Sequence, residues 1–570
     1  MALETVEGEA SPPPNIAEAV NIQKKPPPES PQNVWTRRMV ILAFWAVALL
    51  LGMPVWWKTT EVYRASLPLS QMTDWAEGKN CKPVFPLRIA VKAPMLSSQE
   101  IETIIRITQH ALDDLNDFSA HHLRLVPADP IIHRMSIQEI QEYGNKTSSQ
   151  RNDSEDISLL LNLKPSFGSS TSSTQLQPYA ATLDIYFPNN QVPLSTATSS
   201  PLANFIANEL QALFSEEQAS LSYLMASIPS VAQTSKSKAL SSEMATKLSR
   251  RSTRSFKYAP TYHLTFSLFT AKARPSAWEI EAALEEYLSP LLASLSIISN
   301  FTIDSQVQLY ATFSPSIRQP EFDHERQAWT VRKEDLGGFI NAAEWPLSPS
   351  IGAGPTVNFI LYVPDSAQSP LLIAENGGNS WLVPQWGGIQ IMNLPFSADG
   401  STRPTVLTND DLRPAMHVFS NQLMSLLGLP DTPNSLPLKL STLTRLHTTS
   451  LLSSASSTLG ALARLTQSLT SIAIPDSVAT SVTTTLYRLD AACTDMKEGR
   501  FASALENARV AEAEAEKAFF ERSMVGQVYF PEEHKVAVYL PLLGPVAVPL
   551  VMAALKEIRL LVRGRRVQDG

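Results

Sequence analysis

The sequence predicts a mixed α/β region followed by a helical bundle, with both held between two membrane-spanning helices. Three observations support this fold class. Strand-like segments alternate with amphipathic helical patterns through most of the chain, long helical patterns dominate its last part, and an uncharged apolar run lies near each end. Because 570 residues exceed the roughly 100–200 residues of a usual domain, we expect the α/β region to contain two subdomains.

Composition excludes several classes of protein. Charged residues make up 18% and apolar residues 44% of the chain, which fits a globular protein with a few membrane residues and not a multi-span transporter. The net charge of -8 gives no reason to expect nucleic acid, because phosphate binding needs clustered Lys and Arg. Two cysteines are too few for a disulfide framework or a cysteine-rich metal site.

Two apolar runs are the predicted transmembrane helices. The first, residues 39–57, is uncharged and matches the roughly 20 residues needed to cross hydrocarbon. It follows a proline-rich tail, residues 1–36, which we expect to be disordered. No small-residue cleavage site follows, so the run is predicted to be an uncleaved anchor. The second run, residues 536–555, contains three prolines, which neighbouring helices can accommodate in a membrane.

Flanking cations predict the orientation of both runs. Two lysines and two arginines precede the first run, and a basic tail with five cations, residues 556–570, follows the second. Because Lys and Arg are enriched on the cytosolic side, both termini are predicted to be cytosolic. Residues 58–535 would then lie on the far side of the membrane.

The exit of the first run carries residues typical of a membrane interface. The predicted interface residues are Trp56, Trp57 and Lys58. Tryptophan rings suit this position because they are apolar while their N–H groups stay hydrated. Lys58, Glu61 and Arg64 share one helical face, which predicts that the helix continues until Pro68 ends it.

The predicted α/β region covers residues 58–437. Its main predicted strands are 86–94, 123–128, 156–163, 181–188, 262–270, 300–313, 357–364 and 387–395. Its predicted helices are 97–118, 201–228, 276–298 and one that starts after Asp410 and Asp411. A basic, serine-rich link, residues 235–257, is predicted to be a solvated loop.

The helical bundle is predicted over residues 438–525. Long helical patterns cover 438–473, 476–497 and 500–520, and they are separated by Pro475 and Gly499. The chain then leads into the second apolar run.

A search for catalytic motifs finds none. The chain has no G-x-S-x-G elbow, no H-E-x-x-H, no Walker A loop and no G-x-G-x-x-G. His121 and His122 are adjacent and would point in different directions, so we interpret them as surface residues and not as a metal pair. No cofactor and no metal site is predicted.

The two cysteines are the candidate thiol nucleophiles of the chain. Cys81 lies just beyond the first run, in NCKP, and no histidine signature accompanies it. Cys493 lies on the inner face of a predicted helix, beside Leu489 and Met496, which favours a buried apolar thiol. A disulfide between Cys81 and Cys493 in an oxidising compartment is the alternative.

Three N-x-S/T triplets are candidate glycosylation sites. They begin at Asn145, Asn152 and Asn300, and all three fall in the segment predicted to lie across the membrane.

Several blocks of sequence, in order along the chain, carry a family resemblance. They are PVWWKTTEVYRASLP (54–68), YHLTFSLF (262–269), WEIEAAL (278–284), NFTIDSQVQLYA (300–311), VNFILYVPDSAQSPLLI (357–373), WGGIQIMN (386–393) and EKAFFERSMVGQVYFPEEHKVAVYLPLLGPVAVPL (516–550). The chain resembles the PIG-S family of glycosylphosphatidylinositol (GPI) transamidase subunits, including its fungal members. Only Asn300 among the three triplets lies in such a block, so it is the favoured site.

The resemblance implies an endoplasmic reticulum membrane protein with two passes, cytosolic termini and a large luminal domain. The family's complex removes the C-terminal signal of a precursor and joins the new C-terminus to the ethanolamine amine of GPI. By resemblance, the catalytic Cys and His belong to another subunit, PIG-K. PIG-T, PIG-U and a metallopeptidase-like subunit would be further partners, together with membrane lipid. This chain would then be a non-catalytic accessory subunit.

Two other functions stay open from the residues alone. One is a membrane-anchored luminal enzyme with an unrecognised site, and the other is a general endoplasmic reticulum tether. Purification in mild detergent discriminates between the accessory subunit and the enzyme, because a subunit arrives with a cysteine-protease-like chain and an enzyme arrives alone.

Overall fold

The computed structural model describes residues 30–128, 157–166, 171–226, 241–311, 318–340, 354–394, 404–469, 472–524 and 532–568. They form two compact units. We call the first the terminal unit, which comprises the described residues before Arg64 and after Arg522 together with residues 472–473. The central unit comprises Arg64–Thr470 and Ile474–Arg522.

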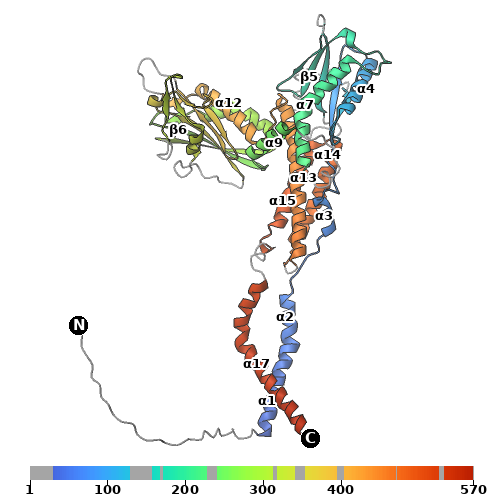
Figure 1. Cartoon of the computed structure of the whole chain (residues 1–570), viewed down its shortest axis with the longest axis vertical. Coiled ribbons are helices and arrows are strands. Elements are labelled where there is room, and N and C mark those ends of the chain that lie inside the picture. The colour runs from blue at the N-terminus through green and yellow to red at the C-terminus, as the bar shows by residue number, and fades with distance from the viewer. Residues whose placement is uncertain are drawn as a thin grey trace, which may run out of the picture. The chain divides into compact units, whose positions relative to one another are not determined.

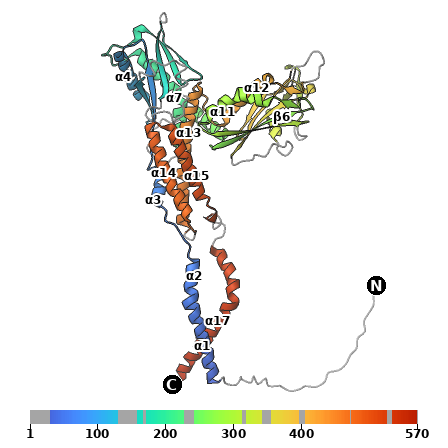
Figure 2. The same cartoon turned by 180° about the vertical axis from the view of Figure 1, so that it is seen from behind.

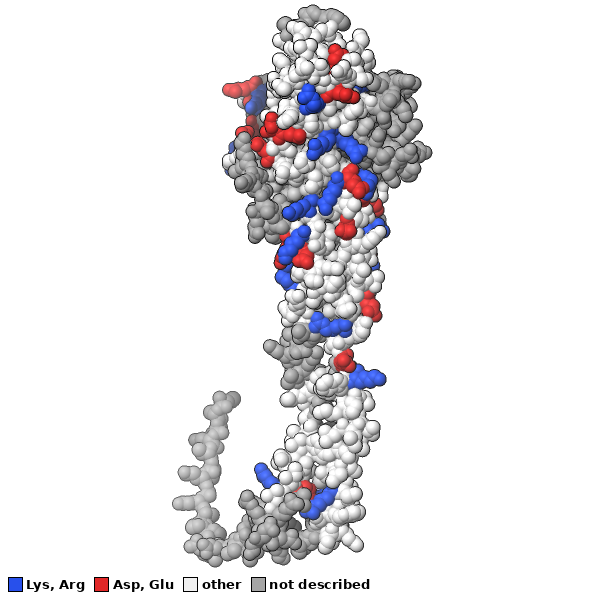
Figure 3. All heavy atoms as spheres, turned by 90° about the vertical axis from the view of Figure 1, so that its right-hand side faces the viewer, with Lys and Arg blue, Asp and Glu red and all other residues white. Residues whose placement is uncertain are grey.

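The terminal unit consists of two long helical segments. Helix α1 (Pro31–Val47), a π-helical turn η1 (Ala48–Gly52) and α2 (Met53–Thr60) follow one another without a break, and α17 spans Glu532–Gln568. Among the described residues, one helix is long and apolar enough to cross a membrane, Pro31–Lys58. The second apolar run lies within α17, which stays helical through its three prolines. On the face drawn in Figure 3, the described charged side chains of this unit lie toward its ends.

The first sheet of the central unit has the strand order β2-β1-β3-β5-β4 and is parallel except for β4. Its strands are β1 (Phe85–Lys92), β2 (His121–Pro127), β3 (Ile157–Ser166), β4 (Ser173–Leu176) and β5 (Thr182–Pro188). Helix α4 (Ser98–Leu115) packs on β2 and on α7 (Pro201–Met225), as Figure 1 shows. A capping box between Ser97 and Glu100 starts α4 and satisfies its first N–H groups. A short 3-10 turn, η3 (Asn189–Gln191), follows β5.

The second sheet has the order β13-β14-β11-β6-β8. Its strands are β6 (Thr261–Thr270), β8 (Asn300–Leu309), β11 (Thr356–Val363), β13 (Ser380–Val383) and β14 (Gly387–Ile391). Strands β6 and β11 are buried along nearly their whole length. Burial on both faces explains the nearly continuous apolar sequence of β11, whereas β6 alternates apolar residues with the buried polar residues His263, Thr265 and Ser267. One face packs on α10 (Ile280–Ala283), η4 (Leu284–Leu288), α11 (Ser289–Leu295) and α12 (Asn409–Leu426).

The other face of the second sheet packs on a small sheet of order β12-β10-β9. The small strands are β9 (Glu321–Asp323), β10 (Ala328–Val331) and β12 (Leu371–Ile373). The short strands β7 (Ala277–Trp278) and β15 (Val406–Leu407) pair separately, and η5 (Lys333–Ile340) and η6 (Ser366–Gln368) are 3-10 turns. The prediction of mixed α/β sheets flanked by helices is therefore confirmed.

The C-terminal helical region is also confirmed. Helices α13 (Leu436–Ser468), α14 (Asp476–Glu498) and α15 (Phe501–Phe519) lie side by side in Figures 1 and 2. Gly499 ends α14 with a φ of 82°, a left-handed conformation that glycine adopts without steric cost. Most buried side chains of α15 are small and are spaced alternately by four and three residues, which lets the helices approach closely: Ala504, Ala508, Ala511, Ala515 and Ala518. Phe501 and Leu505 are the larger buried side chains at its N-terminal end.

The prediction of a solvated loop over residues 235–257 is wrong for its described part. Helix α9 (Ser242–Arg254) begins there after the cap residue Ser241. The helix is amphipathic although its sequence is mostly polar: Leu248 is buried. Lys247 and Arg251 form ion pairs with Glu216 of α7. Tertiary ion pairs therefore stabilise a helix that apolar periodicity alone does not reveal.

Candidate functional site

The segment that follows the predicted membrane exit is tied along the bundle, and we call residues 64–81 the strap. The Arg64 guanidinium donates to the Thr466 carbonyl at 2.6 Å, and the Ala65 N–H donates to the Ile474 carbonyl at 2.8 Å. These bonds need an extended backbone at the start of the strap. Accordingly α2 ends at Thr60, so the predicted continuation of that helix to Pro68 is wrong.

The middle of the strap is helix α3 (Leu69–Ala76), which packs on α13. Met72 and Trp75 are buried beneath it. A Cβ at Gly460 of α13 would collide with the Cβ of Ala76, so the two backbones approach as closely as only glycine permits. Shape complementarity therefore fixes α3 at one position on the bundle.

The strap ends in a disulfide between Cys81 and Cys493 of α14. Both residues are buried, their Cα atoms are 6.1 Å apart, and 412 positions separate them in the sequence. The preferred interpretation of Cys493 as a buried free thiol is therefore wrong. Helical periodicity placed Cys493 inside the bundle, but only the path of the strap brings Cys81 to it.

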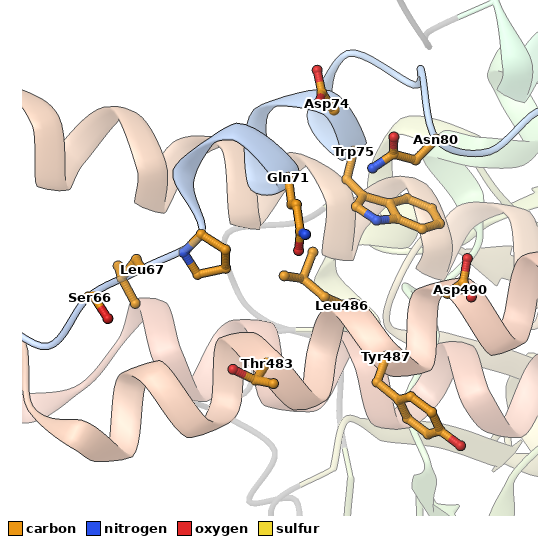
Figure 4. A pocket seen from close by; sticks show the side chains of 11 residues that line it. Ser66, Leu67, Gln71, Asp74, Trp75, Asn80, Thr483, Leu486, Tyr487 and Asp490 are labelled. Atoms are coloured by element: carbon orange, nitrogen blue, oxygen red, sulfur yellow. The ribbon is translucent and has the colours of Figure 1, made fainter.

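A groove lies between α3 of the strap and α14. Its volume is about 860 Å³, and Figure 4 shows Gln71 and Trp75 extending from α3 toward Leu486 of α14. The residues that line it are Ser66, Leu67, Pro68, Gln71, Asp74, Trp75, Asn80, Thr483, Leu486, Tyr487 and Asp490. The described lining includes two carboxylates, Asp74 and Asp490. Two cations contact lining side chains: Lys79 lies 3.3 Å from Asp74, and the Arg488 guanidinium lies 5.8 Å from the Tyr487 ring centroid.

A buried ionic cluster joins the first sheet to the bundle. The Arg445 guanidinium of α13 donates to both carboxylate oxygens of Glu217 in α7, at 2.5 and 2.7 Å. The Thr442 hydroxyl donates to the same carboxylate at 2.6 Å, and the Arg445 guanidinium lies 5.1 Å from the Phe501 ring centroid. Burial opposes ionisation, but the Arg445 charge outweighs it and holds the pKa of Glu217 below its usual value.

His121 belongs to this cluster, so its interpretation as a surface residue is wrong. It is buried on β2, and its Nε2 lies 3.5 Å from a Glu217 oxygen. No local pattern predicts this contact, because His121 and Glu217 come from separate elements far apart in the chain. His122, its neighbour, stays only half-buried on the opposite face of the strand.

The adjacent Glu216 connects a second set of elements. Its carboxylate accepts from Arg251 of α9 at 2.7 Å and from the Thr432 backbone N–H at 3.1 Å. Lys247 lies 3.3 Å from the same carboxylate. The two successive glutamates of α7 therefore connect α9, the turn before α13, and α13 itself.

Arg509 of α15 attaches the second sheet region to the bundle. Its guanidinium donates to the Ile297 carbonyl at 3.2 Å and to the Ile298 carbonyl, and it lies 5.3 Å from the Tyr258 ring centroid. His447 of α13 also contacts the Tyr258 ring. Burial, with Arg509 nearby, lowers the pKa of His447 to about 4, so the imidazole is neutral at physiological pH.

The predicted interface and glycosylation residues occupy distinct places. Trp56 and Trp57 lie on α2 with 58% and 68% of their surface exposed, and Lys58 is exposed beside them. Asn300 is the exposed first residue of the edge strand β8. Asn145 and Asn152 lie outside the described residues.

Two arginines of α1 bind one glutamate of α17 within the terminal unit. Arg37 lies 2.6 Å and Arg38 lies 2.9 Å from separate carboxylate oxygens of Glu557. The Glu557 side chain is largely buried by this contact. The N-terminal part of α1 and the C-terminal part of α17 are therefore held together.

The described contacts of the strap, the bundle and the two sheets hold elements of the central unit together. Within the described ranges, no three His, Cys, Asp or Glu side chains are placed to hold a metal ion. Both cysteines of the chain form the disulfide, so neither is a free thiol. What the described side chains build is a set of ties: the strap, the disulfide, the Glu216–Glu217 pair and Arg509.

Comparison with known proteins assigns these features to a family. The sequence model for PIG-S, described as "Phosphatidylinositol-glycan biosynthesis class S protein", matches residues 43–564. The chain is 29% identical over 556 residues to the "GPI-anchor transamidase component PIGS" of Bos taurus, covering 90% of this chain and 94% of that protein. It is 29% identical over 555 residues to the Homo sapiens protein of that name, with the same coverage. The "GPI transamidase component GPI17" of Saccharomyces cerevisiae is 27% identical over 538 residues, covering 90% of each chain.

Proposed function

The chain belongs to the PIG-S family and is an accessory subunit of the GPI transamidase, and we propose that it performs none of the chemistry of that complex. The observation that carries the assignment is the match over residues 43–564, which spans both the terminal and the central unit. The complex replaces the C-terminal signal of a precursor with a GPI anchor. In this proposal the chain positions other subunits for that reaction.

The state of the cysteines supports a non-catalytic role. Thiolate is the attacking form of cysteine in hydrolysis and acyl transfer. Because Cys81 and Cys493 are bonded to each other, the chain offers no free thiol for such an attack. Among the described residues of the central unit, the buried carboxylates Glu217 and Glu216 have ion-pair partners, Arg445 and Arg251 respectively. Paired charges of this kind hold elements together.

We place the protein in the endoplasmic reticulum membrane as a two-pass protein with cytosolic termini. The cation-rich flanks of both apolar runs support this orientation. The ion pair between Arg37, Arg38 and Glu557 supports it independently, because it joins a point just before the first run to a point just after the second. An antiparallel helix pair of this kind leaves both termini on one side.

The partners follow from the family resemblance. We infer contacts with PIG-K, which would carry the catalytic Cys and His, and with PIG-T, PIG-U and a metallopeptidase-like subunit. Trp56, Trp57 and Lys58 would set the depth of the first span at the luminal interface. Asn300 would carry a glycan in the lumen.

Co-purification tests the proposal. The tagged chain is extracted in a mild detergent and the associated chains are identified by mass spectrometry. Recovery of a cysteine-protease-like chain in stoichiometric amount is expected. Recovery of this chain alone with a hydrolytic activity of its own would favour the luminal enzyme, and recovery alone without activity would favour the general tether.

A further inference from the structure

The second sheet ends in a long strand with an open outer edge. Strand β8 is the last in the order β13-β14-β11-β6-β8, and all ten of its residues pair with β6. No other described strand pairs with β8. The backbone N–H and C=O groups along such an edge can pair with a strand of another molecule, so native proteins protect their edges.

The other described edge strands carry the usual protection. Six of them have only two to four residues: β4, β7, β9, β12, β13 and β15. The longer edge strand β2 ends at Pro127 and carries the exposed Arg124. Short length, proline and charge are features by which edge strands avoid pairing with other molecules.

Strand β8 lacks these features. Its sequence, NFTIDSQVQL, contains no Pro, Lys or Arg, and Asp304 is its one charged residue. Ile303 and Val307 are β-branched, and 39% and 40% of their surfaces are exposed. A segment with high β-propensity, low charge and no proline is prone to pair with the same segment of another molecule. The amino-acid side chains of β8 therefore do not protect its edge.

The triplet Asn300-Phe301-Thr302 places a glycosylation site on this strand. We propose that the glycan on Asn300 covers the outer edge of β8 and prevents it from pairing with a second copy of this chain. The proposal rests on the proposed function, from which it takes the luminal placement of residues 58–535 and the presence of the glycan.

The position of Asn300 suits this role. It is the exposed first residue of β8, and an N-linked glycan is bulky and hydrated. A second strand would lie only about 4.8 Å from β8. A sugar chain that begins at one end of the strand therefore competes for the space that the second strand needs.

The face of β8 that carries Asn300 is polar along its length. Because side chains alternate along a strand, Asn300, Thr302, Asp304 and Gln306 lie on one face. The first three are exposed, and the Gln306 amide donates to the Ser267 hydroxyl at 2.9 Å. Hydroxyl, carboxylate and amide groups can hydrogen-bond to the hydroxyl groups of sugars. This row extends about 20 Å at roughly 3.3 Å per residue, so it offers the glycan polar contacts along the strand.

The test measures the mass of the purified complex in detergent by light scattering. Asn300→Gln removes the glycan, and Thr302→Ser keeps the triplet. Two further variants combine Asn300→Gln with one lysine, either Val307→Lys on β8 or Val406→Lys on β15. These two valines are matched, because each lies in a strand and has 40% of its surface exposed. A folding defect caused by loss of the glycan would affect both lysine variants equally.

Asn300→Gln should raise the particle mass by about twofold or more, because two β8 edges pair and join two complexes. Val307→Lys should restore the natural mass, because a lysine on an edge strand prevents the pairing, whereas Val406→Lys should not. Thr302→Ser should keep the natural mass. Hydrogen exchange in residues 300–309 should slow in the larger particles.

Two results would overturn the proposal. One is an Asn300→Gln complex that keeps the natural mass. The other is a larger mass that Val307→Lys and Val406→Lys leave equally unchanged, because the glycan would then act elsewhere than on β8.

The proposed function is measured separately in the same samples. Mass spectrometry of the natural complex reports the glycan on Asn300 and the partner subunits. A natural protein with partners but without this glycan would overturn the protective role and leave the subunit assignment intact. A natural protein recovered without partners would count against the proposed function.

Discussion

Cys81 and Cys493 are joined by a disulfide although 412 positions separate them in the sequence. The bond fastens the end of the strap to α14, so the segment that leaves the first predicted span is covalently fixed to the bundle. Cross-links that close long loops stabilise a fold mainly by restricting its unfolded chain.

Removing this disulfide should destabilise the central unit. Cys81→Ala, Cys493→Ala and the double variant should each lower the free energy of unfolding by about 2–5 kcal/mol. The expected effect is the same for all three, because either single change abolishes the bond. Thermal unfolding of the purified protein, with and without reductant, is the measurement. A natural protein whose melting temperature did not respond to reductant would contradict the prediction.

The Glu217–Arg445 pair should be costly to break from one side. Glu217→Gln should lower the free energy of unfolding by about 3–5 kcal/mol, because it leaves the Arg445 guanidinium buried without its counter-charge. The double change Glu217→Leu with Arg445→Met should cost much less, because neither charge remains. Chemical denaturation of the natural protein, Glu217→Leu, Arg445→Met and the double variant gives the coupling free energy. A double variant whose loss of stability equals the sum of the losses in these two single variants would refute the pairing.

The same pair predicts a direction for pH dependence. The pKa of Glu217 is lower in the folded protein than the usual value of 4.5. Its contribution to stability is therefore fully present above pH 4.5 and is lost as the pH falls below that value toward the folded pKa. In Glu217→Gln, stability should fall less steeply below pH 4.5 than in the natural protein. Equal slopes for the two proteins would show that Glu217 is not responsible.

Trp56 and Trp57 should matter for assembly. Trp56→Asp with Trp57→Asp places two charges at the predicted interface, which should disturb the depth and tilt of the first span. The expected result is fewer partner subunits recovered per molecule of this chain, measured by quantitative mass spectrometry. Trp56→Leu with Trp57→Leu is the control, since it keeps the segment apolar. Full recovery of partners by the aspartate variant would contradict an anchoring role.

Asn300 tests the topology. If residues 58–535 are luminal, endoglycosidase H should increase the gel mobility of the natural protein, and Asn300→Gln should remove that shift if no other triplet is used. Thr302→Ser is the control, because it preserves the N-x-S/T triplet. Protease added to sealed microsomes should leave the central unit intact. Digestion of the central unit together with an absent mobility shift would contradict the luminal placement of residues 58–535 and indicate the opposite orientation.

Local patterns in the sequence were enough to predict much of the fold. Strand β6 alternates apolar and polar residues, β11 is a nearly continuous apolar run, and the bundle helices are separated at Pro475 and Gly499. These elements can therefore be predicted without knowledge of the tertiary structure. Family resemblance then supplied the function. Neither the local patterns nor the family resemblance depends on contacts between residues that are distant in the sequence.

The ties of the central unit could not be predicted in this way. The sequence around Arg64 predicts a helix, and only the hydrogen bond from Arg64 to a carbonyl group of α13 shows why the backbone is extended there. The sequence of α9 predicts a loop, and only the contact between Glu216 and Arg251 shows why it is a helix. Each tie is a tertiary contact between elements that are far apart in sequence. A single sequence without aligned relatives carries no direct signal for such pairs.

Turnover per assembled complex tests whether this subunit is needed for GPI attachment while it performs none of the chemistry. The complex containing Cys81→Ala and Cys493→Ala is purified, the amount that is fully assembled is quantified, and transamidation is measured for that amount. We expect fewer complexes to be recovered, because the disulfide is lost, while turnover per assembled complex stays near the natural value. A variant that assembled in full amount and lost its turnover would contradict the account and place a catalytic residue in this chain.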